Sequence, residues 1–427
     1  MSILIKNAVI VNADKMNDRP QDILLEKGKI AKIASSIKAE NMKTIDAKGQ
    51  LVMPGFIDIH VHFREPGRED KETIESGSKA AAKGGFTTVM CMPNTRPVID
   101  NRMIVEALIQ ESRRVGLINV IPIGAITKGQ QDQELVDMFE MKKAGCLALS
   151  DDGKSVVNSQ LMRMAIEYSK MADILLIEHC EDPLLSHKGV MNEGTVSTVL
   201  GLKGDPAISE SVIVARDIEL ARYLNARVHL AHMSSRRCVE LIRFAKSQGI
   251  KVTAEATPHH FTLTDESVKS FDTSSKMNPP LRTQDDVDAI KEGLKDGTID
   301  CIVTDHAPHT LEEKELSFDQ APFGIIGLET SVGLTISQLV KTGILSWQQM
   351  VMRMSKAPAQ IIGLNNKGDI KEGMDADITI IDPDQKWEVR KEEVVSKSKN
   401  SPFIGWTLTG QVTTTIFGGK IVYENTT

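Results

Sequence analysis

Residues 56–67 read Phe-Ile-Asp-Ile-His-Val-His-Phe-Arg-Glu-Pro-Gly. The apolar alternation predicts a strand that ends in a turn at Pro66-Gly67. Because side chains alternate along a strand, His60 and His62 point to the same side. Two neutral imidazoles on one side of a strand make half of a metal site. A lone His-x-His also occurs by chance, so the rest of the chain decides what this stretch does.

From residue 56 to about residue 355, short apolar runs alternate with segments whose apolar residues have helical spacing. With the opening strand there are eight such runs, the others being Thr87–Met92, Asn119–Gly124, Cys146–Ser150, Asp173–Glu178, Arg227–Ala231, Lys251–Ala256 and Cys301–Thr304. The helical segments include Asn101–Val115, Ser159–Met171, Glu210–Leu224, Arg236–Gln248 and Thr283–Lys295. Eight strand–helix units predict an α/β fold, a TIM-like (β/α)8 barrel.

Both ends of the chain differ in residue pattern from this central part. They contain β-branched runs around turn residues, as in Ile3–Asn12 and Val412–Tyr423. Neither end holds enough strands for a stable unit of its own. We therefore expect one small β-sandwich domain formed from both termini, residues 1–54 and 360–427, beside a catalytic barrel of residues 55–359. The charged run 391–400 is interpreted as a solvated face.

Composition narrows the functional classes. The chain has 427 residues, a formal net charge of −7 and five cysteines. The absence of a basic stripe argues against nucleic-acid binding, and no secretory signal or membrane-spanning apolar run is visible. Scattered cysteines in or beside apolar runs are typical of buried free thiols in a reducing cytosol. We therefore expect a cytoplasmic protein that does not bind nucleic acid.

Polar side chains follow most of the predicted strands, and eight of the ten histidines lie at these positions. The residues concerned are His60, His62, Arg64, Asn94, Asp151, Asp152, His179, His232, His259, His260, Asp305, His306 and His309. In a barrel of this type the C-terminal ends of the strands build the active site. Histidines and carboxylates without thiolates suit Zn²⁺, and also Mn²⁺, Co²⁺ or Fe²⁺. The sequence therefore predicts metal-assisted hydrolysis on a barrel.

Finer motifs carry a family resemblance. They are His-Val-His-Phe-Arg-Glu-Pro-Gly at 60–67, Met-Pro-Asn-Thr at 92–95, Lys-Met-Asn-Pro-Pro-Leu-Arg at 276–282 and Thr-Asp-His-Ala-Pro-His at 304–309. With the single histidines after the fifth and sixth strands, the pattern resembles the amidohydrolase superfamily, and within it the dihydroorotases of the long bacterial type (class I). The resemblance covers essentially the whole chain.

The resemblance implies the reversible, zinc-dependent cyclisation of N-carbamoyl-L-aspartate to (S)-dihydroorotate plus water, the third step of de novo pyrimidine (UMP) synthesis. It implies one or two Zn²⁺ ions, two being favoured, and a proton-transferring role for Asp305. The implied metal ligands are His60, His62, Asp152, His179, His232 and Asp305. The implied substrate contacts are His62, Arg64, Asn94, Asn278, His309, Phe323 and Gly324.

Several alternatives stay open at this point. Asp151 competes with Asp152 for the bridging position, which many amidohydrolases fill with a carboxylated lysine. Asn94 could be only a turn residue and Asn278 only an element before two prolines, and residues 310–322 form either a solvated loop or a lid. Rival functions are another cyclic amidase (a hydantoinase, dihydropyrimidinase or allantoinase) and a silent homologue that scaffolds aspartate transcarbamoylase. A homodimer, and association with aspartate transcarbamoylase, are expectations from the resemblance alone.

Overall fold

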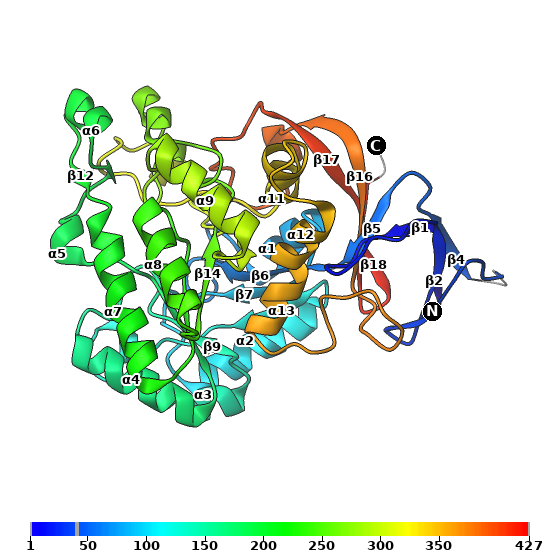
Figure 1. Ribbon diagram of the computed structural model, residues 1–427, viewed down its shortest axis with the longest axis horizontal. Coiled ribbons are helices and arrows are strands. Elements are labelled where there is room, and N and C mark those ends of the chain that lie inside the picture. Colours follow the sequence, from blue (N-terminus) through cyan, green and yellow to red (C-terminus); the bar gives the residue numbers. More distant parts are fainter. Residues whose placement is uncertain (1, 39–41, 426–427) are drawn as a thin grey trace.

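The protein is described here by a computed structural model that covers residues 2–38 and 42–425. A barrel with helices on its outside fills one side of the molecule, and a strand-rich part that holds both marked chain ends lies on the other (Figure 1). Strands β16 and β17 lie between the barrel and the N-terminal strands (Figure 1).

The barrel consists of eight parallel strands in two groups. The three-stranded group is β6 (Phe56–Val61), β7 (Phe86–Cys91) and β8 (Asn119–Pro122). The five-stranded group is β9 (Ala148–Leu149), β10 (Leu175–Glu178), β13 (Val228–Leu230), β14 (Val252–Ala256) and β15 (Cys301–Ile302). Parallel bridges Gly124–Leu149 and Val61–His306 join the two groups at both seams. The predicted barrel is therefore confirmed, with one strand in each of the eight predicted runs.

Helices connect the strands. The longer ones are α1 (Ile74–Lys83), α2 (Arg102–Val115), α3 (Met138–Ala144), α4 (Ser159–Ala172), α7 (Ile208–Leu224), α8 (Arg236–Ser247) and α9 (Gln284–Asp296). The shorter ones are α5 (Pro183–Ser186), α6 (Thr195–Leu200), α10 (Leu311–Lys314), α11 (Ser331–Thr335), α12 (Trp347–Val351) and α13 (Ala357–Ile361). A two-stranded ladder, β11 (Met191–Asn192) with β12 (Gly204–Asp205), lies beside α6.

Local sequence explains where the helices start and stop. The side chain of Asn101 accepts hydrogen bonds from the first turn of α2, and Asn158 does the same for α4. Gly116, with φ of 63°, ends α2 in the left-handed conformation that glycine adopts without strain. The inner face of α2 buries Val105 and Leu108, which fixes its orientation on the barrel.

The strands from both ends of the chain form one eight-stranded sheet. Its members are β1 (Ile3–Ile10), β2 (Gln21–Glu26), β3 (Lys29–Ala34), β4 (Lys43–Asp46), β5 (Leu51–Pro54), β16 (Ile378–Glu388), β17 (Thr407–Phe417) and β18 (Lys420–Glu424). The N- and C-terminal portions meet where β5 pairs antiparallel with β16, Val52 opposite Ile380. Ile5, Ile378 and Ile416 share one buried core, so the two chain ends form one β domain as predicted.

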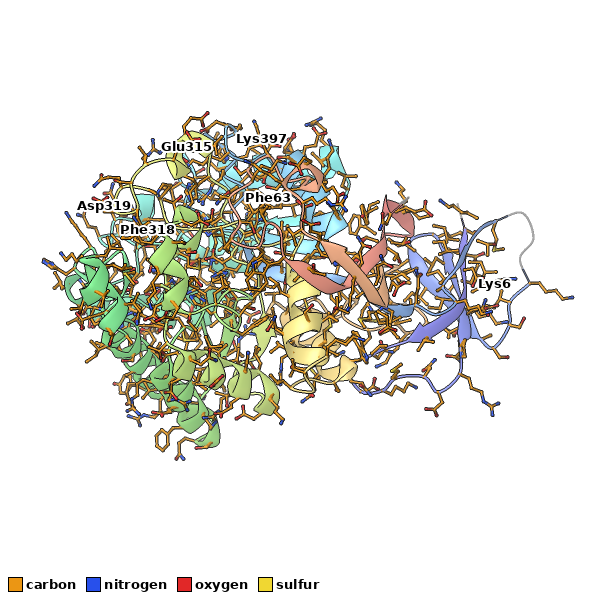
Figure 2. The ribbon with its side chains drawn as sticks, turned by 90° about the horizontal axis from the view of Figure 1, so that it is seen from above. Lys6, Phe63, Glu315, Phe318, Asp319 and Lys397 are labelled. Atoms are coloured by element: carbon orange, nitrogen blue, oxygen red, sulfur yellow. The ribbon has the colours of Figure 1, made fainter. Side chains whose placement is uncertain are left out.

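One expectation was wrong. Residues 391–400 are not simply a solvated face, because Ser396, Ser398 and Asn400 are buried. Lys397, which lies between two of them, points outward, on the barrel side of the molecule and far from Lys6 in the terminal sheet (Figure 2). The segment alternates like a strand, but its inward residues are polar and bind polar groups. An analysis of apolar periodicity cannot detect such a pattern.

The cysteine prediction is confirmed, since all five cysteines are buried and unpaired. In residues 2–38 and 42–425, no helix combines the length and apolar character that crossing a bilayer requires.

Candidate metal centre and substrate cavity

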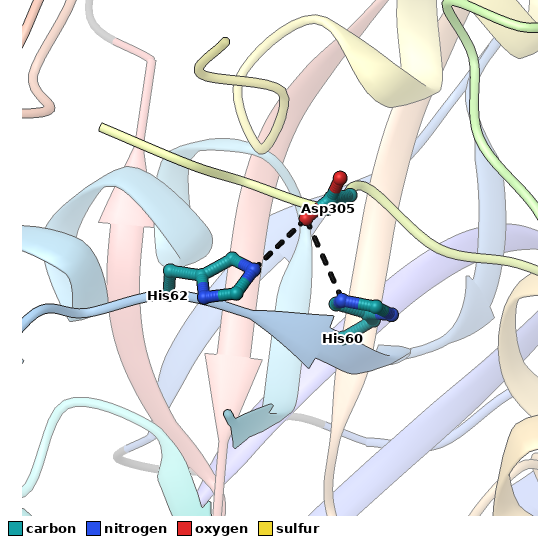
Figure 3. A group of neighbouring side chains, drawn as sticks. All are labelled: His60, His62 and Asp305. Atoms are coloured by element: carbon teal, nitrogen blue, oxygen red, sulfur yellow. Dashed lines mark hydrogen bonds and ion pairs between the residues drawn. The ribbon is translucent and has the colours of Figure 1, made fainter. Parts of the chain in front are cut away.

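The opening strand supplies the first corner of the site. His60 and His62 leave β6 on the same side and face Asp305, which follows β15 (Figure 3). Nε2 of His62 lies 3.0 Å from Oδ1 of Asp305, and Nε2 of His60 lies 3.5 Å from the same oxygen. Nε2 of His60 is buried and has no hydrogen-bond partner. A buried nitrogen left without a partner but aimed at a carboxylate is what a metal ligand looks like without its ion.

Asp152, directly after β9, brings the two halves of the site together. Its carboxylate lies 3.3 Å from Nε2 of His60 and 3.4 Å from Nε2 of His62. On the other side it lies 3.6 Å from Nδ1 of His179 and 3.6 Å from Nε2 of His232. The structure thus gathers all six residues that the sequence predicted as metal ligands.

The neighbouring Asp151 points away from this cluster. Its Oδ1 accepts hydrogen bonds from the backbone N–H groups of Ile126 (2.8 Å) and Thr127 (3.1 Å), and its Oδ2 accepts one from the Thr127 hydroxyl. These bonds connect two loops at the barrel end. Asp152 and Asp151 therefore have separate tasks, and only Asp152 faces the histidines.

Charge in the cluster favours cations. Burial opposes ionisation of Asp152, yet the charge of His60 and the hydrogen bonds of His179 and His232 hold the pKa of this carboxyl well below its usual range. Burial likewise opposes a charged His60, but Glu255, Asp152 and Asp305 raise its pKa well above the ordinary value. A pocket that stabilises positive charge with carboxylates and imidazoles fits divalent metal ions.

Three side-chain oxygen atoms from residues outside the ligand cluster fix the orientation of the histidines. Nδ1 of His60 lies 2.6 Å from Oε1 of Glu255, and Nε2 of His179 lies 3.1 Å from Oε2 of Glu181. Nδ1 of His62 lies 2.9 Å from the side-chain oxygen of Asn94. Because these oxygens accept, the contacted nitrogen carries a proton and the opposite nitrogen faces the site, where it could bind a metal ion in place of a proton.

Sequence reasoning did not find Glu255 or Glu181. An acidic residue inside the apolar run Lys251–Ala256 was the available signal for Glu255, which lies on β14. Glu255 also contacts Nε2 of His229 (2.9 Å), whose Nδ1 contacts the Thr253 hydroxyl (2.7 Å). Since both nitrogens of His229 are already satisfied, this deeper group supports His60 and is not a second metal site.

A cavity of about 290 Å³ opens next to the ligands. All seven predicted substrate contacts line it: His62, Arg64, Asn94, Asn278, His309, Phe323 and Gly324. Asn94 donates to Oδ2 of Asp152 (3.3 Å), and Asn278 donates to Oε2 of Glu181 (2.8 Å). Both amides are therefore engaged with carboxylates of the site and are more than turn residues.

Arg64 is the cation of the cavity. It is half-buried, has φ of 62°, and donates from Nε to the carbonyl of Pro308 (3.2 Å). Burial lowers the pKa of Arg64 to about 10, so the guanidinium stays charged at neutral pH. Among the described residues, no carboxylate oxygen lies within 4.0 Å of its guanidinium nitrogens. A cation without a protein counter-ion beside a cavity is suited to an anionic ligand.

His309 lies beside Arg64 as a neutral ring. Burial and the charges of Arg64 and Lys71 lower the pKa of His309 to about 2. Nδ1 accepts a hydrogen bond from Nζ of Lys71 (3.0 Å), and Nε2 donates to the carbonyl of Phe323 (2.8 Å). Lys71, which the sequence gave no reason to select, thus sets the tautomer of His309.

Residues 310–322 are anchored to the barrel rather than freely solvated. Nζ of Lys314 donates to the carbonyls of Pro322 (2.9 Å) and Gly324 (3.1 Å). Nζ of Lys276 donates to the carbonyl of Asp319 (3.0 Å) and lies 4.6 Å from the centre of the Phe323 ring. These two buried lysines hold the loop against the cavity, while its outer face, including Leu311, stays exposed.

Comparisons with known proteins agree with this geometry. A family described as Dihydro-orotase-like matches residues 49–238, and the amidohydrolase family matches residues 328–423. A dihydroorotase from Endomicrobium trichonymphae is 52% identical over 424 residues, which span 99% of this chain and 100% of the relative. One from Geobacter metallireducens is 50% identical, with the same coverage of both chains. The chain belongs to the dihydroorotase family.

Solved structures of hydantoinases and dihydropyrimidinases share the fold of this dihydroorotase-family chain. The L-hydantoinase (dihydropyrimidinase) of Arthrobacter aurescens is 27% identical, with a TM-score of 0.88 over 99% of this chain and 96% of that one. The dihydropyrimidinase of Brevibacillus agri, at 23% identity, has the same fold, with a TM-score of 0.86 over 100% and 95% of the two chains.

Proposed function

We propose that this protein is a metal-dependent dihydroorotase, which interconverts N-carbamoyl-L-aspartate and (S)-dihydroorotate in the third step of pyrimidine synthesis. One observation carries the proposal beyond a general cyclic amidase. The cavity beside the six candidate ligands contains Arg64, a guanidinium with no carboxylate of the described chain within 4.0 Å. Dihydroorotate carries a carboxylate that the uncharged rings of hydantoin and dihydrouracil lack, and a guanidinium can bind a carboxylate through two parallel hydrogen bonds.

The donor set fits two Zn²⁺ ions. His60, His62 and Asp305 would hold one ion, His179 and His232 the other, and Asp152 lies between the two groups. When bound, such ions polarise the ring carbonyl and lower the pKa of a water molecule. The three oxygen contacts from Glu255, Glu181 and Asn94 keep the imidazoles in the tautomers that this requires.

Asp305 would carry the proton. Burial opposes its ionisation, but the charges of His60 and His62 hold its pKa far below the usual range, so the carboxylate is unprotonated at neutral pH. In the hydrolytic direction it takes a proton from the attacking water and gives it to the leaving ring nitrogen. In the biosynthetic direction it would take the proton of the attacking carbamoyl nitrogen and give it to the carboxylate oxygen that leaves as the C–N bond forms.

The remaining cavity residues would orient the substrate. Arg64 would bind the carboxylate together with Asn94, and the neutral His309 would join them by turning its one N–H from the Phe323 carbonyl to the ligand. Asn278 and the backbone at Phe323-Gly324 lie on other parts of the wall, where they would meet the amide edge of the ring. All six candidate ligands are present, which argues against the rival hypothesis of a catalytically silent scaffold.

The deciding experiment measures metal content and turnover on the same purified sample, with dihydroorotate, dihydrouracil and hydantoin as substrates. We expect one to two zinc ions per chain and a preference for dihydroorotate. Faster opening of hydantoin or dihydrouracil would contradict the assignment. A sample without turnover after zinc reconstitution would instead favour the scaffold.

Assembly belongs to the same proposal. We expect a homodimer, with possible docking to aspartate transcarbamoylase, on the strength of family resemblance. Light scattering after size exclusion, with and without added transcarbamoylase, tests both expectations.

A further inference from the structure

Asn400 is a buried side chain in the segment between β16 and β17, remote in sequence from every residue of the site. Its Oδ1 accepts a hydrogen bond from the backbone N–H of His309 (3.1 Å). Its Nδ2 donates to the carbonyls of Ala307 (3.1 Å) and Gly324 (3.1 Å). One amide group therefore satisfies three backbone groups on two separate segments.

Both segments line the cavity, one through Ala307 and His309 and the other through Phe323 and Gly324. Residues 306–309 follow β15 and end in His309, whereas residues 323–326 return from the loop through Phe323 and Gly324. Next to Asn400 they pair as parallel strands would, with the Ala307 N–H donating to the Ile325 carbonyl (2.7 Å). The backbone carbonyl of Asn400 accepts from Ile326 N–H (2.9 Å), so the contact continues along the returning segment.

We propose that Asn400 is a positioning residue that sets the spacing between His309 and Gly324, and through it the simultaneous recognition of the carboxylate and the ring edge. The inference rests on the proposed function, because it assigns these two groups to two ends of one substrate. Asn400 touches no substrate itself and acts through the backbone of the wall.

The chemistry of the contact requires an asparagine. Two donors and one acceptor in a short, planar group match two carbonyls and one N–H. An aspartate of the same shape would lose both donors and bring a charge against two carbonyl oxygens. An alanine would leave the His309 N–H and the Ala307 carbonyl without this partner, while the Gly324 carbonyl would keep only Nζ of Lys314. The histidines of the ligand cluster are held independently, by Glu255, Glu181 and Asn94, so these changes should leave them in place.

Four variants test the inference: Asn400→Ala, Asn400→Asp, the milder Asn400→Ser, and Ser401→Ala as the matched control. Ser401 is buried next to Asn400, but its hydroxyl bonds only within its own segment, to the N–H of Phe403. The measurements are kcat and KM for dihydroorotate, zinc content, and the Kd of orotate, a planar analogue with the same ring and carboxylate.

For Asn400→Ala we expect KM and the orotate Kd to rise together by about tenfold or more, with kcat within threefold and zinc content unchanged. Asn400→Asp should be at least as weak, Asn400→Ser intermediate, and Ser401→Ala close to wild type. If Asn400→Ala does not fold, the intermediate rise in Asn400→Ser is the deciding result.

The inference is overturned if the folded variants keep KM and Kd within twofold of wild type while Tm falls, because that is a purely structural role. It is also overturned if kcat and zinc content fall without a change in Kd. A wild-type protein that neither turns over dihydroorotate nor binds orotate would overturn the proposed function, and this inference with it. If the wild-type protein turns over dihydroorotate and binds orotate, a negative result with the variants contradicts this inference alone.

Discussion

Two walls of the same cavity are built in different ways. One wall, which we call the ligand wall, consists of the six candidate metal ligands. Its side chains lie at the ends of barrel strands and are held by buried side chains of other strands, as His60 is by Glu255. On the carboxylate wall, His309 and Gly324 lie on loops, and their positions depend on side chains from outside the barrel strands, among them Lys71, Lys314 and Asn400.

Because of this difference, we expect substitutions in the two walls to have different effects. Strand ends are rigid because their backbone is paired on both sides, which suits groups that must hold ions and move a proton. Loops tied by a few side chains can change between relatives without disturbing the barrel, which suits the recognition of different rings. Changes on the ligand wall should therefore lower kcat or metal affinity, and changes on the carboxylate wall should raise KM.

The largest effect is expected from Asp305→Ala. Removing a group that transfers the proton should lower kcat by about 10²–10⁴-fold or more, because the variant also loses a candidate metal ligand. Circular dichroism should show an intact fold. Asp319→Ala, an exposed carboxylate on the 310–322 loop, is the control and should behave like wild type. Turnover close to wild type in Asp305→Ala would remove the proposed role.

Among changes on the carboxylate wall, Arg64→Met should have the largest effect on substrate binding. Losing a charged, two-pronged contact to the carboxylate should raise KM for dihydroorotate by about 10²-fold and leave zinc content unchanged. Arg68→Met is a matched control, since Arg68 lies on the same segment but is already paired with Asp70 and Glu313. An unchanged KM in Arg64→Met would mean that another group binds the carboxylate.

Glu255→Gln tests how the ligand wall is supported. The variant keeps the shape of the side chain but weakens the contact that orients His60, and metal affinity should fall about 10–100-fold. Chelator competition measures this affinity. Thr253→Val is the control, because Thr253 reaches His60 only through His229 and Glu255. Equal losses in both variants would indicate a general loosening of the barrel.

The same contrast explains how much could be predicted from the sequence. His60 and His62 lie at the end of β6 and Asp305 follows β15, and strand periodicity and barrel geometry have local sequence signals, so a cluster of metal-binding side chains at this end of the barrel could be predicted, whereas the resemblance supplied the set of six ligands. The resemblance supplied the roles on the carboxylate wall. The choice between Asp151 and Asp152 needed the structure, because adjacent residues in a loop have no fixed period.

The supporting contacts could not be predicted, for a physical reason. Glu255 lies 195 residues from His60, and Asn400 lies 91 residues from His309. Such pairs depend on how the elements pack, which no local pattern encodes. In residues 396–401 the inward positions are occupied by serines and an asparagine, so the segment resembled solvated chain although it is held by hydrogen bonds.

The smallest effect is a dependence on pH that belongs to the carboxylate wall. Burial lowers the pKa of Lys314 from 10.5 to about 7. Between pH 7 and pH 10 the unfolded chain therefore binds more protons at this residue than the folded chain, so its contribution to stability rises with pH across this window.

Lys314→Met removes the titrating group and keeps most of the side-chain volume. As pH increases from 7 to 10, Tm of the wild type should rise relative to Tm of the variant, by on the order of 2 °C. Lys341→Met, on the surface, should run parallel to wild type over the same range. A Tm difference between wild type and Lys314→Met that stays constant with pH would show that Lys314 remains a cation throughout, and that the loop next to Gly324 is held by a full charge.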